Sequence, residues 1–328
     1  MELNGRVIEE QKNYFLVDTP NGVIRCVIKG SLKKVRTRVC VGDLVLVTVT
    51  NSDKTDTDHA EGIIAKVESR TSFIKRPAIA NLTRILLIAT WKSPPLDFEA
   101  LDRMLFSAEV FGIEPVIVFN KIDLLSADEL LLQKEIMTIY ERCGYTTLAT
   151  SAQTGDNIDK LLDCCKDGIS AFTGLSGVGK STLLSKIFPD TEFRIGDVSG
   201  TYGRGTHTTT NNVLHPFTPG SYLADTPGLS FVDIPTVPEE SVASCFPEIA
   251  ACTGLCRFNN CTHDGAPGCA VQEKIDNNEI SESRRSQYLK IYNEMKSLRK
   301  QYSKKPSGSK KQEAEGRSYN WKQHLGSD

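Results

Sequence analysis

The chain has 328 residues, of which 39% are hydrophobic, 7% aromatic and 24% charged. These values predict a globular protein of two or three domains, and they exclude collagen-like, mucin-like and globally disordered chains. The 39 Lys and Arg nearly balance the 41 Asp and Glu, so the whole chain is not a polycation that coats nucleic acid; a local basic patch stays open.

The longest strongly apolar run, ILLIATW at 85–91, is far shorter than the ~20 residues that span a bilayer. The N-terminus MELNGRVIEE carries no signal-peptide pattern. We therefore expect a soluble cytoplasmic protein without a membrane partner. Separately, we expect the protein to be a monomer. Ten cysteines in such a chain favour reduced thiols plus a metal site over a disulfide framework.

Residues 1–68 contain five short runs rich in β-branched and aromatic residues, separated by turn signals. The runs are Val7–Ile8, Tyr14–Val17, Val23–Val27, Leu44–Val49 and Gly62–Val67. Five short strands in this length predict a small β-barrel of the OB type. The alternative is a β-domain that binds no ligand.

The periodicity changes at residue 69. Continuous apolar runs at 85–90 and 115–119 are typical of strands buried on both faces of a parallel sheet. Helical spacing lies between them, at Leu101, Met104, Leu105, Ala108 and Phe111. Ser126 and Glu129 form a capping-box pattern, which predicts a helix carrying Leu132, Ile136 and Ile139 and ending near Gly144. The alternation continues to about residue 235 and predicts an α/β domain.

The sequence GLSGVGKS at 174–181 matches the phosphate-binding loop G-x-x-x-x-G-K-[ST], between an apolar run at 169–173 and a helical pattern at 180–188. The loop's N–H groups would wrap a phosphate, Lys180 would reach the β- and γ-phosphates, and the Ser181 hydroxyl would bind Mg²⁺. The predicted nucleotide-binding residues of this segment are Gly174, Leu175, Ser176, Gly177, Val178, Gly179, Lys180, Ser181 and Thr182.

The sequence DTPG at 225–228 follows an apolar strand pattern at 222–224. Asp225 is expected to hold Mg²⁺ through water, and the Gly228 N–H to contact the γ-phosphate. Between the two phosphate motifs, the Gly- and Thr-rich stretch 196–211 predicts a switch loop. One of its threonines should complete the Mg²⁺ shell, and Thr209 is the candidate.

Leu229 stands where many GTPases carry a water-orienting glutamine, which predicts slow intrinsic hydrolysis. His207 in the switch loop is the candidate to orient the attacking water, together with Lys180 and Thr209 as catalytic residues. A solvated loop histidine is the alternative reading of His207.

The sequences NKID at 120–123 and TSA at 150–152 each end a predicted strand. The Asp123 carboxylate, which only accepts hydrogen bonds, matches the N1–H and N2–H₂ donors of guanine, and adenine lacks that arrangement. Lys121 would lie over the base, and the N–H of Ala152 would reach the guanine O6. Asn120 and Ser151 complete these two motifs.

The motif order is unusual, because Asp123 precedes Gly174 by about fifty residues, whereas ordinary GTPases place the phosphate loop first. Ligands of open parallel sheets bind at the carboxyl ends of the strands, so a circularly permuted chain can assemble the same pocket.

The pattern Cys256-x₄-Cys261-x-His263-x₅-Cys269 brings three thiolates and one imidazole within fourteen residues, a set suited to one tetrahedral Zn²⁺. Because protein fills all four positions, the site should be structural. Cys252 is an alternative ligand. The remaining thiols, Cys26, Cys40, Cys143, Cys164 and Cys165, are expected to be simply buried.

Residues 283–302 predict a helix with an apolar stripe through Tyr288, Ile291, Met295, Leu298 and Tyr302. Residues 284–311 hold ten Lys and Arg against one Glu, a basic segment able to contact RNA phosphates, although an ordinary solvated helix explains part of that charge. The barrel is a second candidate RNA surface. The polar tail 306–328 is expected to be disordered.

The N-terminal barrel, the permuted motif order and the sequence CRFNNCTHDGAPGCA together resemble the bacterial small-subunit-dependent GTPases of the RsgA (YjeQ/EngC) family. The resemblance covers residues 1 to about 305. It implies an OB-fold domain at 1–68, a circularly permuted GTPase domain at 69–235 and a zinc-binding domain with a basic helix at 236–305, followed by the tail. The switch sequence GTHTTT is similar to the family's G-x-H-T-T-x and supports His207.

The resemblance further implies a late assembly factor of the small (30S) ribosomal subunit that binds rRNA and whose GTPase is stimulated by that subunit. Two alternatives stay open on the residues alone. One is a GTP-gated RNA-binding module with incidental hydrolysis, and the other is a large-subunit assembly GTPase.

Overall fold

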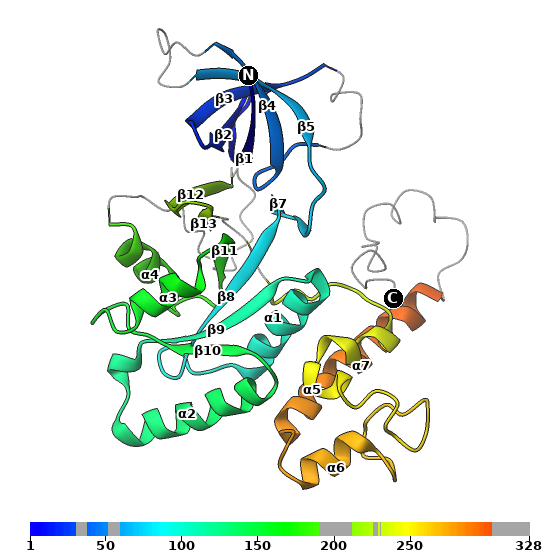
Figure 1. Ribbon diagram of the computed structural model, residues 1–328. Coiled ribbons are helices and arrows are strands. Elements are labelled where there is room, and N and C mark those ends of the chain that lie inside the picture. Colours follow the sequence, from blue (N-terminus) through cyan, green and yellow to red (C-terminus); the bar gives the residue numbers. More distant parts are fainter. Residues whose placement is uncertain (31–37, 52–59, 190–211, 226–228, 230, 304–328) are drawn as a thin grey trace. The chain divides into compact units, whose positions relative to one another are not determined.

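The computed structural model describes residues 1–30, 38–51, 60–189, 212–225, 229 and 231–303 (Figure 1). The chain divides into two compact units. The first comprises 1–96, 113–125 and 148–230, and the second 97–112, 126–147 and 231–328. The second unit thus joins two helices from the middle of the chain to the C-terminal region. The domain boundaries at 68, 235 and 305 stay predictions.

The N-terminal part of the first unit is a closed five-stranded barrel, as predicted. Its strands are β1 (Glu2–Glu10), β2 (Phe15–Thr19), β3 (Gly22–Ile28), β4 (Leu44–Asn51) and β5 (Ala60–Val67). β1 pairs with both β2 and β4, β3 pairs in parallel with β5, and β4–β5 completes the ring. Alternate side chains fill the interior, including Val7, Val17, Val45 and Ile64, which are at most 1% exposed.

A mostly parallel sheet follows in the order β10-β9-β8-β11-β13-β12. Its strands are β8 (Leu82–Thr90), β9 (Glu114–Asn120), β10 (Thr146–Ala149), β11 (Gly168–Thr173), β12 (Val213–Thr218) and β13 (Ser221–Asp225). β8 pairs in parallel with β9 and β11, and β11 with β13, whereas β12 runs antiparallel to β13. The predicted continuous burial of 85–90 and 115–119 is confirmed.

Two short helices cover this sheet with apolar side chains, and a hairpin precedes it. The helices α3 (Ile158–Cys164) and α4 (Lys180–Ile187) bury Leu161, Leu183 and Leu184 against Leu86 and Val118 of the sheet. The hairpin consists of β6 (Phe73–Lys75) and β7 (Ala78–Ala80). A single-turn helix, η2 (Ile122–Leu124), follows β9.

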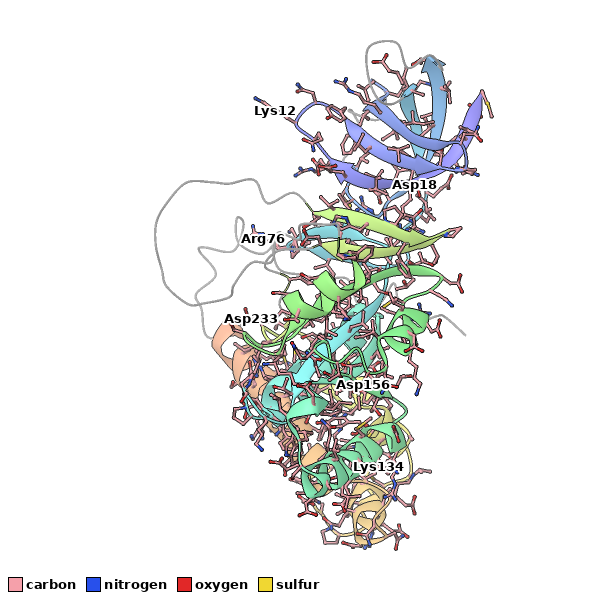
Figure 2. All side chains as sticks on the ribbon, turned by 90° about the vertical axis from the view of Figure 1, so that its left-hand side faces the viewer. Lys12, Asp18, Arg76, Lys134, Asp156 and Asp233 are labelled. Atoms are coloured by element: carbon pink, nitrogen blue, oxygen red, sulfur yellow. The ribbon has the colours of Figure 1, made fainter. Side chains whose placement is uncertain are left out.

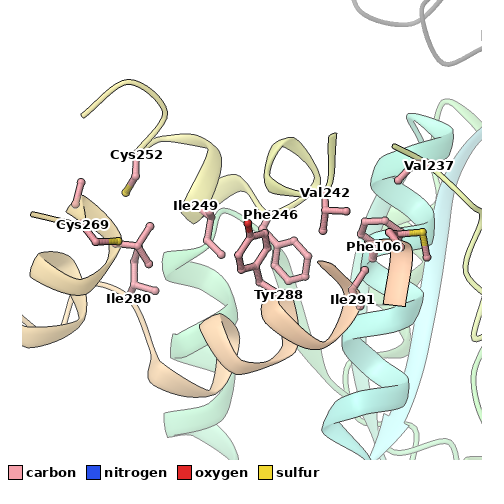
Figure 3. Packing of buried hydrophobic residues seen from close by; sticks show 13 residues of the cluster. Phe106, Val237, Val242, Phe246, Ile249, Cys252, Cys269, Ile280, Tyr288 and Ile291 are labelled. Atoms are coloured by element: carbon pink, nitrogen blue, oxygen red, sulfur yellow. The ribbon is translucent and has the colours of Figure 1, made fainter. Parts of the chain in front are cut away.

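The second unit packs around a long C-terminal helix. Its helices are α1 (Phe98–Phe111), α2 (Ala127–Arg142), α5 (Pro247–Ala250), α6 (Ala270–Asp276) and α7 (Glu282–Ser303), with single turns η3 (Glu239–Ser241) and η4 (Ala243–Cys245). Phe106, Phe246, Ile249, Tyr288 and Ile291 form the centre of its core (Figure 3). Tyr288, Ile291 and Met295 confirm the predicted stripe of α7.

The helix predicted after Ser126 is confirmed as α2, and its capping box with Glu129 is present. On this helix Leu132 is 49% exposed, whereas Gln133 and Tyr140 are buried. The first basic residue of α7, Arg284, is not solvated, because it is 1% exposed and lies between two carboxylates. Hydrophobic spacing finds the apolar stripe of a helix but does not recognise a charge that is buried with its partners.

The thiols outside the metal cluster fit the expectation of buried, unreactive side chains. Cys26, Cys40, Cys143 and Cys165 are buried, and burial raises the pKa of each to about 12. Cys164 is half-buried. Among the described residues, no helix combines the length and hydrophobicity needed to cross a bilayer.

Candidate nucleotide site and metal centre

The predicted phosphate loop connects the end of β11 to the start of α4. Gly174 and Gly179 both adopt positive φ angles, +149° and +94°. A Cβ at Gly174 would lie 2.2 Å from the carbonyl oxygen of Ile88, and one at Gly179 would lie 2.4 Å from the Nδ2 atom of Asn120. Only glycine fits these two positions, so the loop's close approach to β8 and to the Asn120 side chain explains why the motif has glycine at both.

The polar groups expected to contact phosphate and Mg²⁺ surround this loop. The Nζ atom of Lys180 donates to the carbonyl oxygens of Gly174 and Leu175 at 2.8 and 2.9 Å, which holds the ammonium over the loop. Ser181 and Thr182 are exposed on the first turn of α4. Asp225 ends β13, two strands from β8, and is 8% exposed. The phosphate loop and this carboxylate thus occupy carboxyl ends of neighbouring parallel strands.

Asn120 joins three segments of the site. Its side chain is 1% exposed, and its Nδ2 atom donates to the carbonyl oxygen of Val178 in the phosphate loop at 2.9 Å. Its Oδ1 atom accepts from the Thr150 hydroxyl at 3.3 Å and from the N–H of Ala152 at 3.2 Å. The amide therefore holds the NKID and TSA segments against the predicted phosphate loop, and in this structure the N–H of Ala152 is directed at Asn120.

Asp123 is exposed on η2, and the hydroxyl of Ser151 donates to its Oδ1 atom. This hydrogen bond orients the carboxylate and brings the NKID and TSA segments together. Lys121 precedes η2 with a φ angle of +66°, and its Nζ atom donates to the carbonyl oxygens of Gly177 and Ser93, at 2.5 and 2.6 Å. The lysine thus also links the NKID segment to the predicted phosphate loop.

The carbonyl of Ser93 belongs to a loop that sequence reasoning missed. Residues 91–96 follow β8, and the Thr90 hydroxyl donates to the carbonyl oxygen of Pro94 at 2.6 Å. A Cβ at Gly177 would lie 3.6 Å from the Cδ atom of Pro94, so this loop borders the phosphate loop. The available signal was the turn sequence KSPP at the carboxyl end of a predicted strand.

Three candidate site residues lie outside the described part of the chain. These are His207 and Thr209, predicted as catalytic, and Gly228, predicted to contact the γ-phosphate. Leu229 is described, and it is 7% exposed with its carbonyl oxygen accepting from the Thr173 hydroxyl at 3.2 Å. A buried leucine cannot orient a water molecule, which fits the prediction of slow intrinsic hydrolysis.

The predicted metal ligands converge in the second unit. The ligand atoms of Cys256, Cys261, His263 and Cys269 all lie within 4.8 Å of one another. The Nδ1 atom of His263 is 3.6 Å from the Sγ atom of Cys256 and 3.7 Å from that of Cys269. Tetrahedral zinc bonds of about 2.3 Å to sulfur and 2.0 Å to nitrogen require such separations, so the four residues fit a metal ion.

The surroundings of the thiols also suit a metal centre. The N–H of Ala270 donates to the Sγ atom of Cys256 at 3.3 Å, and the N–H of His263 to that of Cys261 at 3.4 Å. Such donors stabilise thiolate charge. Cys252 is not one of these four residues, and its Sγ atom donates to the carbonyl oxygen of Glu248 at 3.6 Å. As a ligand, Cys252 stays the alternative.

The basic residues of α7 are largely paired within the second unit. Arg285 pairs with Glu282, Lys290 with Glu99 at 2.8 Å, and Arg299 with Glu239 at 2.7 Å. Arg284 lies between Asp102 and Glu248. These ion pairs neutralise much of the positive charge of residues 284–299, which the sequence pattern indicates as a contact for RNA phosphates.

The sheet order, the permuted loops and the barrel define the class of protein as a circularly permuted GTPase with an N-terminal OB-type barrel. The chain matches the RsgA GTPase family over residues 67–235 and the RsgA N-terminal domain over residues 4–55. It belongs to the RsgA GTPase family.

Relatives and solved structures agree over most of the chain. A small ribosomal subunit biogenesis GTPase RsgA from Moorella thermoacetica is 36% identical over 88% of this chain and 95% of its own length. A small ribosomal subunit biogenesis GTPase RsgA from Bacteroides fragilis is 34% identical over 88% of this chain and 96% of its own length. The crystal structure of YjeQ from Thermotoga maritima aligns with a TM-score of 0.77 at 33% identity, over 90% of this chain and 99% of that one. The crystal structure of YloQ, described as a circularly permuted GTPase, aligns with a TM-score of 0.77 at 27% identity, over 91% of this chain and 96% of that one.

Proposed function

We propose that this protein hydrolyses GTP with Mg²⁺ and acts in the biogenesis of the small ribosomal subunit, which stimulates its turnover. The observation that carries this proposal is the convergence of the phosphate loop, Asp123 and Asp225 at the carboxyl ends of one sheet, in a chain of the RsgA GTPase family. The proposed partner, the small ribosomal subunit, is taken from the names of its relatives. Equilibrium binding of GTP against ATP tests the nucleotide, with GTP preferred by at least ~100-fold.

Each part of the site has a distinct proposed role. Asp123 reads the guanine base, supported by its orientation through Ser151. The loop N–H groups and Lys180 bind the phosphates, and Ser181, Thr209 and Asp225 complete the Mg²⁺ shell, directly or through water. Bound Mg²⁺ would neutralise charge that develops on the phosphates. Asn120 and Lys121 hold the guanine motif against the phosphate loop.

We also propose that the metal at the cysteine cluster is zinc and that its role is structural. Three soft thiolates together with an imidazole favour zinc over Mg²⁺ or Ca²⁺, which prefer oxygen ligands. Protein fills all four positions, which leaves no site for a reacting water. The rRNA is the proposed contact of the barrel and the C-terminal region, and the proposed location is the cytoplasm.

Replacement of one cluster thiol tests the metal. We expect Cys261→Ser to lose bound zinc, because a serine hydroxyl is a far poorer ligand, and to lower the thermal stability of the second unit. Metal analysis of the purified protein provides the measurement. Cys245→Ser is the matched control, since Cys245 lies outside the cluster and its Sγ atom donates to the carbonyl oxygen of Ser241. One full equivalent of zinc in Cys261→Ser contradicts the ligand set.

Replacement of the switch histidine tests catalysis. We expect His207→Ala to lower subunit-stimulated GTP turnover about 100-fold with GTP affinity unchanged, because the proposed role of the imidazole is to orient water and not to bind the nucleotide. Single-turnover kinetics with small subunits measures the effect. His324→Ala, in the C-terminal tail, is the control. If His207→Ala shows normal stimulated turnover, the catalytic role is wrong and His207 is a solvated loop histidine.

A further inference from the structure

The barrel and the nucleotide-binding sheet meet at a polar seam within the first unit. Strand β1 of the barrel pairs with β12, with Glu9 opposite Val213. Beside this pairing, the hydroxyl of Tyr222 on β13 donates to the Oδ2 atom of Asp18 on β2 at 2.7 Å. The guanidinium of Arg6 on β1 lies 5.3 Å from the centre of the Tyr222 ring. Asp18 is labelled in Figure 2.

The two sheet strands of this seam are also the strands that connect the switch segments. β12 begins at Val213, directly after the predicted switch loop, and β13 ends at Asp225, the predicted Mg²⁺ residue. The strands form an antiparallel pair in which Val213 lies opposite Asp225. The two predicted switch segments therefore flank, in the sequence, the strands that contact the barrel.

A second contact ties the same strands to the barrel. Asn212, at the entrance of β12, is 7% exposed, and its Nδ2 atom donates to the carbonyl oxygen of Ala78 on β7 at 2.7 Å. The end of β7 is in turn bonded to the barrel, because the N–H of Ala80 donates to the carbonyl oxygen of Val41 at 2.9 Å. The side chain of Asn81 donates to the carbonyl oxygen of Gly42 at 3.0 Å.

Tyr222 is suited to hold this seam at a fixed position. Its side chain is 6% exposed, and burial together with its hydrogen bond to Asp18 raises its pKa to about 12, so the hydroxyl remains a donor near neutral pH. A hydrogen bond to a carboxylate is stronger than one between neutral groups. The Arg6 cation adds an attraction to the ring face, and its Nη1 atom donates to the carbonyl oxygen of Gly42 at 3.1 Å.

We propose that Tyr222 is a positioning residue that couples the two switch strands to the barrel, so that the barrel responds to the presence of the γ-phosphate. Switch segments of GTPases rearrange when that phosphate is bound or lost. The paired strands β12 and β13 carry this change to Asp18 and Arg6. Coupling free energies are reciprocal, so a partner held by the barrel also biases the switch strands.

Hydrogen exchange of the full chain tests the coupling without any ribosomal component. In the wild-type protein with Mg²⁺, we expect the amides of β1 and β2 to exchange at rates that differ by at least ~3-fold between GDP and guanosine 5′-(βγ-imido)triphosphate. Tyr222→Phe should remove this difference while nucleotide affinity and melting temperature stay close to wild type. Tyr14→Phe, which deletes a tyrosine hydroxyl elsewhere in the barrel, should preserve it.

Two further variants separate the hydrogen bond from packing. Asp18→Asn retains an oxygen acceptor and should keep the nucleotide-dependent difference, whereas Asp18→Ala should lose it. Equal exchange of β1 and β2 with both nucleotides in the wild type overturns the proposal. So does a full difference in Tyr222→Phe.

The partner side of the inference rests on the proposed function, and its failure can be recognised separately. With small subunits, Tyr222→Phe should show stimulation reduced about tenfold at unchanged basal turnover. If wild-type turnover does not respond to small subunits although the exchange difference is present, the proposed function fails and the coupling stands. If the wild type responds and Tyr222→Phe responds equally, the coupling fails and the proposed function stands.

Discussion

Asp123→Asn should change the base preference of this protein from guanine to xanthine. The carboxylate accepts from two adjacent donors of guanine, and an asparagine amide presents one donor and one acceptor, which match the C2 carbonyl and N1–H of xanthine. Hydrogen bonds to a charged group contribute about 1.5–3 kcal/mol each, so GTP affinity should fall at least ~100-fold. Equilibrium competition between GTP and xanthosine triphosphate measures the change.

A neighbouring carboxylate provides the control for this variant. Asp156 lies in the loop after β10, and its Oδ2 atom accepts from the Thr154 hydroxyl at 2.7 Å (labelled in Figure 2). Asp156→Asn keeps an acceptor for that hydroxyl and should leave the preference for GTP within ~3-fold of wild type. Unchanged GTP affinity in Asp123→Asn would remove Asp123 from the guanine site.

Arg284→Met should cause a large loss of stability in the second unit. The Nε atom of Arg284 donates to Glu248 at 2.8 Å, and its Nη1 atom donates to Asp102. Burial alone would lower the pKa of the guanidinium, but these two carboxylates outweigh burial and hold that pKa above its usual range. Removal of the cation leaves both carboxylates buried and unpaired, at a cost of about 3–5 kcal/mol in the free energy of unfolding.

The rings of Tyr140, Tyr145 and Phe246 enclose the same guanidinium, with centroids 4.8 to 5.7 Å from its Cζ atom. Urea unfolding of the zinc-loaded chain measures the effect. Lys290→Met on the same helix is the control, because its pair with Glu99 is exposed and should contribute less than about 1 kcal/mol. A change below about 1 kcal/mol for Arg284→Met would show that its carboxylates find other partners.

The location of the GLSGVGKS, NKID and TSA segments at strand ends was predictable because each segment is a contiguous motif. Gly174 directly follows β11, Gly179 is the N-cap of α4, and Asp123 lies on the single turn after β9. The metal cluster was predictable for a similar reason, since all its ligands lie within one short segment. The barrel followed from five short strands within the first 68 residues, and its closure through the β3–β5 pairing is shown by the structure.

Interactions between distant segments were not predictable from periodicity. Asn120 reads as a guanine contact in its motif, yet its side chain bonds to Val178, 58 residues away. In the sequence, Arg284 is one of several basic residues on a helix that is expected to be exposed. Its partner Asp102 lies 182 residues away in the sequence. Burial of these polar groups depends on long-range packing, and a single sequence does not reveal which distant partner compensates a charge.

GTP turnover by the purified protein with and without purified small ribosomal subunits tests the central claim most directly. Large subunits and ATP serve as controls for partner and nucleotide. The account predicts slow basal hydrolysis, consistent with the buried Leu229, and strong stimulation of GTP hydrolysis by small subunits alone. Equal turnover with and without small subunits, or stimulation by large subunits instead, would contradict it.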